Sequence, residues 1–244
     1  MVRIASDEVT HGDPLAAATR ELTRTGVAVL PAFALSRSLG IHLEEWIRFG
    51  RHWDDLLPDP YAAELGTRRL RRYGRYLMDD TARPVPTEDF VQPEDSNPLY
   101  IGKSRQFEPL TPAFAEDPVL HGLLAVLRRI ASALDEVTEW NVKVHPFRSQ
   151  SSRSGNGRPT PEGMHRDGVT LVSSLLIRRR NALGGQSVVR DPDGRQLLAT
   201  TLAEPGTLLL GDDRRTVHGV SPIRPIDDSG PAQRDVLVIT FASC

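Results

Sequence analysis

The chain has 244 residues, of which 39% are hydrophobic and 25% are charged, and its formal net charge is -2. These values are ordinary for a globular protein, and the near-zero charge excludes a general attraction to nucleic acid or to an anionic membrane. A single cysteine, Cys244, excludes a disulfide within the chain and a cysteine-based metal cluster.

The length suits one domain, and we expect residues 1–244 to form a single one. The amino-terminal residues show no basic segment followed by an apolar core, and no apolar run approaches the roughly 18 residues of a membrane span. Cysteine is rare, as is typical of proteins from a reducing compartment. We therefore predict a soluble cytoplasmic protein. The sequence does not define its oligomeric state.

Helical patterns dominate the first half of the chain. We predict a short helix over residues 14–25, followed by an apolar strand over residues 26–31 that a proline ends. Apolar residues at steps of three and four predict further helices over residues 36–57 and 116–135. Residues 80–112 are rich in Pro, Asp, Glu and Ser and have no clear period, which predicts a long loop. Residues 1–137 should thus form a mostly helical part that flanks the core.

Arginines alternate with leucine and tyrosine over residues 66–76. A basic stretch with aromatic residues can bind a nucleic acid backbone. A strand with one solvated basic face is the commoner structure, and nothing else in the composition favours nucleic acid. We expect the strand and no nucleic acid partner.

From residue 140 the apolar period changes from that of a helix to that of strands. Short apolar runs are separated by turn signals such as Asp193-Gly194 and Pro205-Gly206. The predicted strands span residues 140–146, 169–177, 187–190, 196–202, 207–210, 216–223 and 234–242. Such regular spacing favours a jelly roll, or cupin-like double-stranded β-helix, over residues 138–244. The fold class is then mainly β with flanking helices.

A histidine and a carboxylate stand two residues apart at His165 and Asp167, just before a predicted strand. In a strand, residues i and i+2 point the same way and can bind one ion together. The same spacing occurs at residues 11–13 and 52–54. The first of these lies in a polar segment and the second in a helical period, which would separate its side chains. Only His165 precedes a β pattern.

His218 lies far enough along the chain for the intervening strands to return to His165. Two histidines and one carboxylate occupy one face of an octahedral iron(II) and leave three positions open. Alone, His218 would more often be a hydrogen-bonded core or loop residue. Arg234 opens the last predicted strand, where its guanidinium could bind a carboxylate through two hydrogen bonds. Alone, it would be read as a surface arginine.

These residues stand in an order that resembles the iron(II)- and 2-oxoglutarate-dependent dioxygenases. The matching motifs are His165-x-Asp167, Gly184-Gly185-Gln-Ser, Leu208-Leu209-Leu210, His218-Gly-Val-x-Pro222 and Arg234. Residues 159–168, 180–181, 212–215 and 234–241 are similar, more narrowly, to the bacterial free amino acid hydroxylases that include L-isoleucine 4-hydroxylase. The resemblance covers residues 140–241.

The resemblance implies that His165, Asp167 and His218 bind iron(II) and that Arg234 binds the distal carboxylate of 2-oxoglutarate. It implies hydroxylation by O2 of an unactivated C–H bond in a small free L-amino acid, aliphatic or cyclic such as pipecolate, with release of succinate and carbon dioxide. The product would be a building block for a natural product. One residue departs from the common pattern: Val236, not a serine or threonine, follows Arg234 by two positions. A second partner for that carboxylate must come from elsewhere.

Substrate contacts are less well marked. An amino acid needs a cation for its carboxylate and an acceptor for its ammonium group. Arg148 and Glu162 are our candidates, and Arg105 and Tyr100 in the long loop are alternatives, although each residue type is more often structural or solvated. Asp213 is a candidate for orienting a metal ligand or an arginine, and Gly184 and Gly185 are expected to be turn residues with positive φ.

Three alternatives remain open from the sequence. The same chemistry could act on a carrier-bound or peptide-bound residue. A noncatalytic β-barrel that binds a small ligand could retain the histidines. A nucleic acid demethylase would use the arginines near residue 70 and would bind oligonucleotides in a strongly salt-dependent way.

Overall fold

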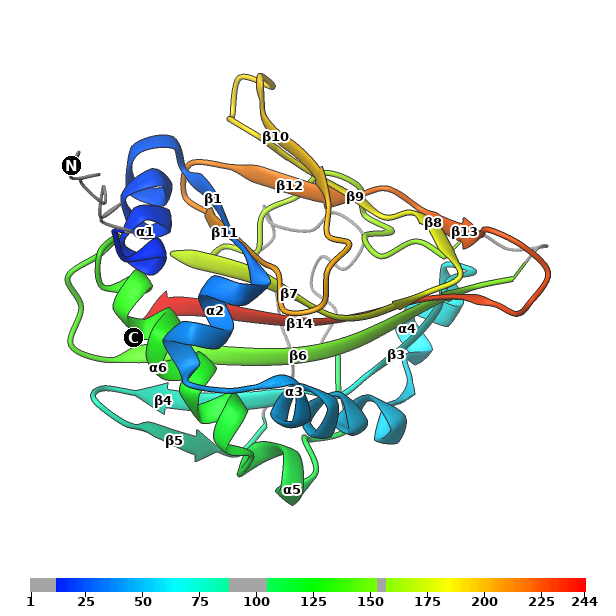
Figure 1. Ribbon diagram of the computed structural model, residues 1–244, viewed down its shortest axis with the longest axis horizontal. Helices are drawn as coiled ribbons and strands as arrows, with labels where there is room; N and C mark the ends of the chain where they lie inside the picture. The colour runs from blue at the N-terminus through cyan, green and yellow to red at the C-terminus, as the bar shows by residue number, and fades with distance from the viewer. Residues whose placement is uncertain (1–11, 88–104, 153–156) are drawn as a thin grey trace, which may run out of the picture.

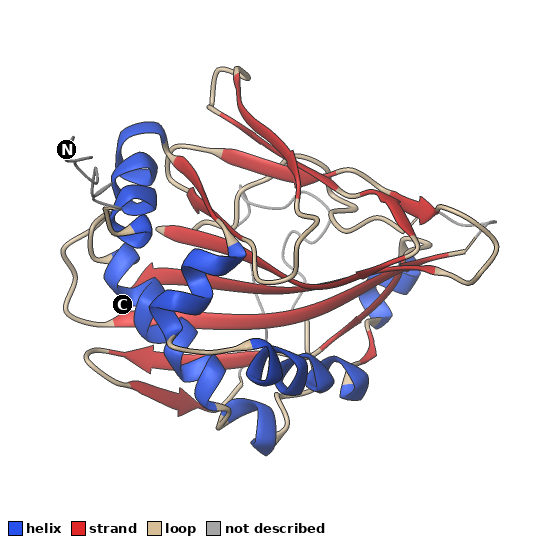
Figure 2. Ribbon diagram, viewed as in Figure 1, coloured by secondary structure: helices blue, strands red, loops and turns tan. Residues whose placement is uncertain are grey.

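A computed structural model describes residues 12–87, 105–152 and 157–244. A large curved antiparallel sheet runs through the molecule, most helices gather along one side of it, and a small sheet lies on the other side (Figures 1 and 2). Two sheets that face one another are the layers of a jelly roll. The predicted fold class is confirmed.

The helices described in the structure are α1 (Pro14–Thr25), α2 (Ala32–Leu39), α3 (Leu43–Gly50), α4 (Pro60–Glu64), α5 (Pro112–Ala115) and α6 (Pro118–Ala131), with a 3-10 helix at Arg51–Asp55. None of them is long and apolar enough to cross a membrane, within the part of the chain that the structure describes.

The large sheet has the order β1 (Val27–Leu30), β11 (Leu208–Asp212), β7 (Leu171–Arg180), β14 (Ala232–Ser243), β6 (Trp140–Ser151), β3 (Arg68–Arg71) and β2 (Leu57–Pro58). β4 (Gly74–Met78) also pairs with β6, and β5 (Ala82–Val85) pairs with β4. The small sheet has the order β10 (Gln196–Thr201), β9 (Gln186–Arg190) and β12 (Val217–Val220). β13 (Ile223–Pro225) pairs with β8 (Ala182–Gly184).

One face of the large sheet packs against the helices and the other faces the small sheet, because successive side chains of a strand point to opposite faces. On β6, Val142 and Val144 pack into the hydrophobic core beneath α6, where Leu123 and Leu127 are fully buried. The residues between them point the other way, towards the small sheet. The helices thus cover the apolar outer face and leave the inner face for a site.

The predicted helix over residues 36–57 is broken in the structure. Gly40, with φ 65°, ends α2 in the left-handed conformation, and a capping box between His42 and Glu45 starts α3. His52 then lies 3.0 Å from the Asp117 carboxylate and stacks on Phe114, so its ring is packed against the protein and does not face Asp54. The apolar period continued across Gly40 and concealed the break.

The part before residue 138 does more than flank the core: the strand predicted over residues 26–31 is β1, and the strand expected near residue 70 is β3. β1 and β3 hydrogen-bond into the large sheet beside β11 and β6, so residues on both sides of this boundary form one sheet. The sequence did not predict that these four-residue strands join the large sheet, because their partners are distant in the sequence.

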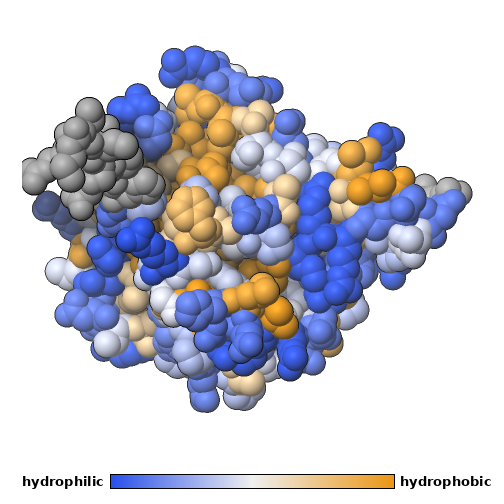
Figure 3. Space-filling model, in the orientation of Figure 1, coloured by the Kyte–Doolittle hydropathy of each residue, from blue (hydrophilic) through white to orange (hydrophobic). Residues whose placement is uncertain are grey.

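The face seen in Figure 3 is largely hydrophilic, with an apolar area below the β10 hairpin. Phe33 and Leu43 are among the large hydrophobic side chains that remain exposed, at 68% and 71%. Scattered apolar residues on a surface are common and need no function.

Asp235 forms a buried ion-pair network on the helix-covered face. It is fully buried on β14, and its carboxylate lies 2.8 Å from Arg148 on β6 and 3.0 Å from Arg178 on β7. We expect Asp235→Ala to lower the free energy of unfolding by about 3–5 kcal/mol, because two arginines lose their carboxylate. Asp54 contacts the same arginines but is 60% exposed, so Asp54→Ala should cost less than about 1 kcal/mol. Urea denaturation measures both, and equal losses would contradict the network.

Candidate active site

A cavity lies between the inner face of the large sheet and the small sheet. Its walls come from β6, β7, β11 and β14 on one side, from β9 and β12 on the other, and from the segment of residues 159–169 that enters β7. His165, Asp167, His218 and Arg234 all line this cavity. Residues far apart in the sequence thus meet at one place.

His165 and His218 are held side by side by their own backbones. The N–H of each residue donates to the C=O of the other, at 2.9 Å in both directions. This reciprocal pair fixes two rings whose centroids are 4.4 Å apart. His218 belongs to β12, whereas His165 sits in the segment before β7.

Asp167 is positioned by a loop and not by a strand. β7 begins only at Leu171, so our argument from strand alternation does not apply to this pair. Instead, the backbone N–H groups of Asp167, Gly168 and Val169 donate to the Asp213 Oδ2 atom at 2.9, 2.8 and 3.1 Å. Gly168 has φ 73°, a conformation that suits glycine. The turn directs the Asp167 side chain back towards the histidines.

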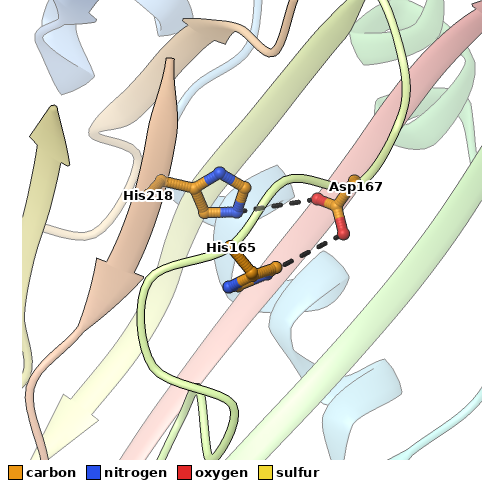
Figure 4. A group of neighbouring side chains, drawn as sticks. All are labelled: His165, Asp167 and His218. Atoms are coloured by element: carbon orange, nitrogen blue, oxygen red, sulfur yellow. Dashed lines mark ion pairs between the residues drawn. The ribbon is translucent and has the colours of Figure 1, made fainter. Parts of the chain in front are cut away.

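The three side chains converge on one point, as Figure 4 shows. Asp167 Oδ2 lies 3.6 Å from His218 Nε2, and Asp167 Oδ1 lies 3.9 Å from His165 Nε2. One ligand atom from each residue lies within 4.8 Å of the others. Two imidazoles and one carboxylate in this arrangement fit a metal that prefers mixed nitrogen and oxygen ligands, such as iron(II).

The two histidines present their Nε2 atoms to the Asp167 carboxylate. His165 Nδ1 lies 3.1 Å from the Gly163 carbonyl and donates to it, which orients the ring. Burial, with a smaller effect from His165, lowers the pKa of His218 to about 4, so this imidazole is neutral at pH 7. Neutral imidazole is the ligating form.

Asp213 contacts both the loop and a histidine. Its Oδ1 lies 3.6 Å from His218 Nδ1, and its Oδ2 accepts the three loop hydrogen bonds. Burial and the nearby Asp167 charge raise the pKa of Asp213 to about 7, although the backbone N–H donors act in the opposite direction. Asp213 thus lies behind the His218 ring, and its role in orienting that ring stays a prediction.

Arg234 points into the cavity from β14 and is only 2% exposed. Its Nε and Nη2 atoms are buried without a hydrogen-bond partner in the part of the chain that the structure describes. Burial lowers the pKa of Arg234 to about 10, and the charge of Arg179 adds to this effect. A buried guanidinium with unused donors fits a carboxylate ligand.

Comparison with known proteins identifies the family. A family model described as 2OG-Fe dioxygenase matches residues 50–240, which is more than half of the chain. The chain belongs to the 2OG-Fe dioxygenase family. This family uses iron(II) and 2-oxoglutarate, with O2 as co-substrate. The unused donors of Arg234 and the His-Asp-His group fit these requirements.

Similar proteins span most of this dioxygenase. A 3(1)-hydroxy-L-isoleucine 4-dioxygenase of Pantoea ananatis is 27% identical over 217 residues, which cover 82% of this chain and 81% of the relative. An L-isoleucine-4-hydroxylase of Bacillus thuringiensis is 24% identical over 191 residues, with 76% and 78% covered. A crystal structure of a bsmA homologue from Methylobium petroleophilum has a TM-score of 0.87 at 35% identity, and the match covers 94% of this chain and 93% of that one.

Two of the predicted substrate contacts lie in the cavity of this dioxygenase. Glu162 lines it, with Oε1 at 3.4 Å from His165 Nε2, and its Oε2 is buried without a hydrogen-bond partner among the described residues. Arg105 also lines the cavity and is 3% exposed. Tyr100, the other loop candidate, lies outside the described residues.

The prediction for Arg148 is wrong. β6 directs Lys143, His145 and Phe147 into the cavity, so Arg148 points to the opposite face. There its guanidinium binds Asp235, which already compensates its charge. The sequence indicated this orientation, because alternate residues of a strand face the same side. Arg148 is separated from the apolar Val142 and Val144 by an even number of positions, so it shares their side of the sheet.

The basic stretch near residue 70 is not a solvated face either. Arg69 and Arg71 are 9% and 4% exposed and line the cavity from β3. Arg71 lies over the Phe107 ring at 3.5 Å and donates to His145 Nδ1 at 2.7 Å, while Arg69 binds the buried Asp59. Burial, followed by the charge of Arg71, lowers the pKa of His145 well below its usual value, which keeps it an acceptor. Sequence reasoning missed this cationic wall.

Gly184 and Gly185 have positive φ, at 82° and 68°, as predicted. Their role exceeds that of a turn. A Cβ on Gly185 would lie 3.0 Å from Arg179 Nη1 and 3.3 Å from Arg234 Cδ, so this glycine leaves room for the arginine that lines the cavity.

Proposed function

We propose that this dioxygenase hydroxylates an unactivated C–H bond of a small free L-amino acid, aliphatic or cyclic. The observation that carries the proposal is the convergence of His165, Asp167 and His218 within 4.8 Å in a cavity that also holds the unused donors of Arg234. The substrate class rests on the relatives, two of which are named for oxidation of isoleucine or its derivative.

In this proposal, His165, Asp167 and His218 bind iron(II), and Arg234 binds the distal carboxylate of 2-oxoglutarate. Iron(II) and 2-oxoglutarate, when bound, would supply together with O2 the chemistry that converts C–H into C–OH, with one oxygen atom entering the hydroxyl group and the other entering succinate as carbon dioxide is released. The protein orients the reactants and excludes water. Asp213 keeps the His218 ring aimed at the metal position, which is the usual task of a carboxylate behind a ligating histidine.

Glu162 and Arg105 are suited to the two charged ends of an amino acid. The Glu162 carboxylate lies next to the proposed metal position and has an oxygen available for an ammonium group. Arg105 brings a buried cation to the same cavity for the α-carboxylate. Opposite charges in the lining of one cavity favour a zwitterion and one orientation of it.

Glu162→Gln should raise the KM for the amino acid by about 10- to 100-fold, since a hydrogen bond to a charged group contributes about 1.5–3 kcal/mol. The KM for 2-oxoglutarate should change by less than about threefold, because Arg234 is untouched. Steady-state assays with each substrate varied in turn measure both constants. An equal rise in both would show instead that Glu162 supports the metal centre as a whole.

The function is tested by incubating the iron-loaded protein with 2-oxoglutarate, ascorbate and a panel of free amino acids that includes pipecolate. We expect one amino acid or a small group to gain one oxygen atom by mass spectrometry, with an equal amount of succinate. The His218→Ala protein serves as the control and should give neither product. If every free amino acid is unchanged while carrier-bound aminoacyl groups are hydroxylated, the tethered-substrate alternative replaces this proposal.

The other two alternatives have lost their support. A noncatalytic β-barrel has no reason to keep a complete ligand set beside a buried arginine, and the chain belongs to a dioxygenase family. Nucleic acid binding rested on the arginines of residues 66–76, and two of these, Arg69 and Arg71, are buried and face the cavity, so they do not contribute to an outer basic surface.

A further inference from the structure

Ser187 on β9 is a buried polar residue without an assigned task. Its side chain is 2% exposed and lines the cavity. Its hydroxyl has no hydrogen-bond partner among the residues that the structure describes. Buried hydroxyl groups in native proteins are nearly always hydrogen-bonded, so an unused one in a cavity wall indicates a ligand.

The position of Ser187 relates it to both halves of the proposed site. β9 pairs with β12, so that His218 stands opposite Val189 and Val220 stands opposite Ser187. Ser187 is therefore two residues along β9 from Val189, the residue paired with His218, which is a distance of about 6.5 Å along the strand. The buried positions of this segment are 185, 187 and 189, so Ser187 lies between Gly185 and Val189 on the cavity side.

Gly185, at the other end of the series 185, 187 and 189, lies next to Arg234. A Cβ on Gly185 would lie 3.3 Å from Arg234 Cδ, so the stem of the arginine passes directly beside this residue. Along β9, Ser187 thus lies between Val189, which is paired with His218, and Gly185, which lies beside the aliphatic part of Arg234. Ser187 lines the cavity at this position. An anion held by Arg234 and extended towards the histidines would pass the Ser187 hydroxyl.

We propose that Ser187 is the second donor to the carboxylate that Arg234 binds, a role that rests on the proposed function of Arg234 in 2-oxoglutarate binding. Val236 follows Arg234 by two residues and cannot donate a hydrogen bond, so this cavity must take a hydroxyl from another element. A guanidinium fork satisfies one side of a carboxylate, and a buried carboxylate needs further donors for its remaining lone pairs. Ser187 supplies one from the opposite sheet.

Ser149 is the matched control for this assignment. It stands directly opposite Arg234 in the β6–β14 ladder, lines the same cavity and is also 2% exposed. Ser149 lies on β6 of the large sheet, whereas Ser187 lies on β9 of the small sheet, and the Ser149 hydroxyl is not among the buried side-chain atoms that lack a partner in the described residues. Ser149→Ala therefore removes a cavity hydroxyl of equal burial near the same arginine.

The test compares two ligands by isothermal titration calorimetry on the anaerobic, iron(II)-loaded protein. One is 2-oxoglutarate, and the other is 2-oxopentanoate, which has the same keto acid end and chain length but no distal carboxylate. Ser187→Ala should weaken 2-oxoglutarate binding by about 10- to 100-fold, as expected for a hydrogen bond to a charged group, and should leave 2-oxopentanoate binding unchanged. Ser187→Cys, which keeps the volume with a weaker donor, should show the same selective loss. Ser149→Ala should bind both ligands like the wild type.

Equal weakening of both ligands by Ser187→Ala would make Ser187 a structural residue and overturn the assignment. No weakening of either would also overturn it, and a selective loss in Ser149→Ala alone would transfer the role to that residue. A wild-type protein that binds 2-oxopentanoate as tightly as 2-oxoglutarate would instead refute the role of Arg234. The failure of the proposed function is thereby separated from the failure of this inference.

Discussion

Asp167→Ala is expected to reduce the rate of amino acid hydroxylation by at least about 1,000-fold, equivalent to about 4 kcal/mol of transition-state stabilisation. Asp167 is the one carboxylate in the His-Asp-His group, and without it two neutral imidazoles remain to bind a divalent cation. Product formation measured by mass spectrometry at saturating iron(II) checks the loss.

Asp54→Ala is the matched control for this variant. Asp54 stands in the same His-x-Asp spacing, at residues 52–54, but its side chain is 60% exposed and binds Arg148 and Arg178 far from the cavity lining. Its removal should leave the hydroxylation rate within about twofold of wild type, which is below ~0.5 kcal/mol. Activity retained in Asp167→Ala, or lost equally in both variants, would refute the ligand role.

Arg234→Met should have the second large effect, on 2-oxoglutarate binding. Two charge-assisted hydrogen bonds of about 1.5–3 kcal/mol each would be lost, so the Kd for 2-oxoglutarate should rise by at least about 100-fold. The change should also stabilise the protein without 2-oxoglutarate. Arg234 is a fully buried cation with unused donors, and replacing an uncompensated buried charge by an apolar side chain of similar length removes its desolvation cost.

Calorimetry and thermal unfolding check the two halves of this prediction together. We expect weaker binding of 2-oxoglutarate and a melting temperature at or above that of the wild type in the absence of the ligand, as is common when a functional residue is removed from its strained site. A large drop in melting temperature with unchanged binding would instead make Arg234 part of the structural framework.

The second half of the fold was predictable because its strands are bounded by turn residues and carry a clear apolar pattern. β9, β10 and β14 lie within two residues of the predicted ends. The first half was predicted less well. Gly40 interrupts a continuous apolar period. The strands β1 and β3 were expected, but their places in the large sheet depend on partners distant in the sequence. Tertiary pairing decides such short segments, and a local pattern cannot show it.

The sequence predicted which side chains meet but not how they are held. The loop that carries Asp167 is fixed by three hydrogen bonds to Asp213, a long-range contact that a two-residue spacing cannot show. In the sequence, Ser187 is only the last residue of a glycine motif, because its importance depends on its hydroxyl having no partner among the residues that the structure describes.

Arg148 shows the opposite case, in which the sequence contained the answer. A jelly-roll strand has an apolar face under the helices and a second face in the cavity, so the parity of Val142 and Val144 assigns Arg148 to the first. We chose Arg148 for its charge and did not consider which side of the strand it faces, so the prediction put it on the wrong side of the sheet.

Anaerobic titration of the metal-free protein with iron(II) tests the central claim most directly. The account predicts that the wild type binds about one ion per chain and that a protein carrying both His165→Ala and His218→Ala, still folded by circular dichroism, binds none. Equal uptake of iron(II) by the two proteins would contradict it, because the metal would then lie somewhere other than between these two histidines.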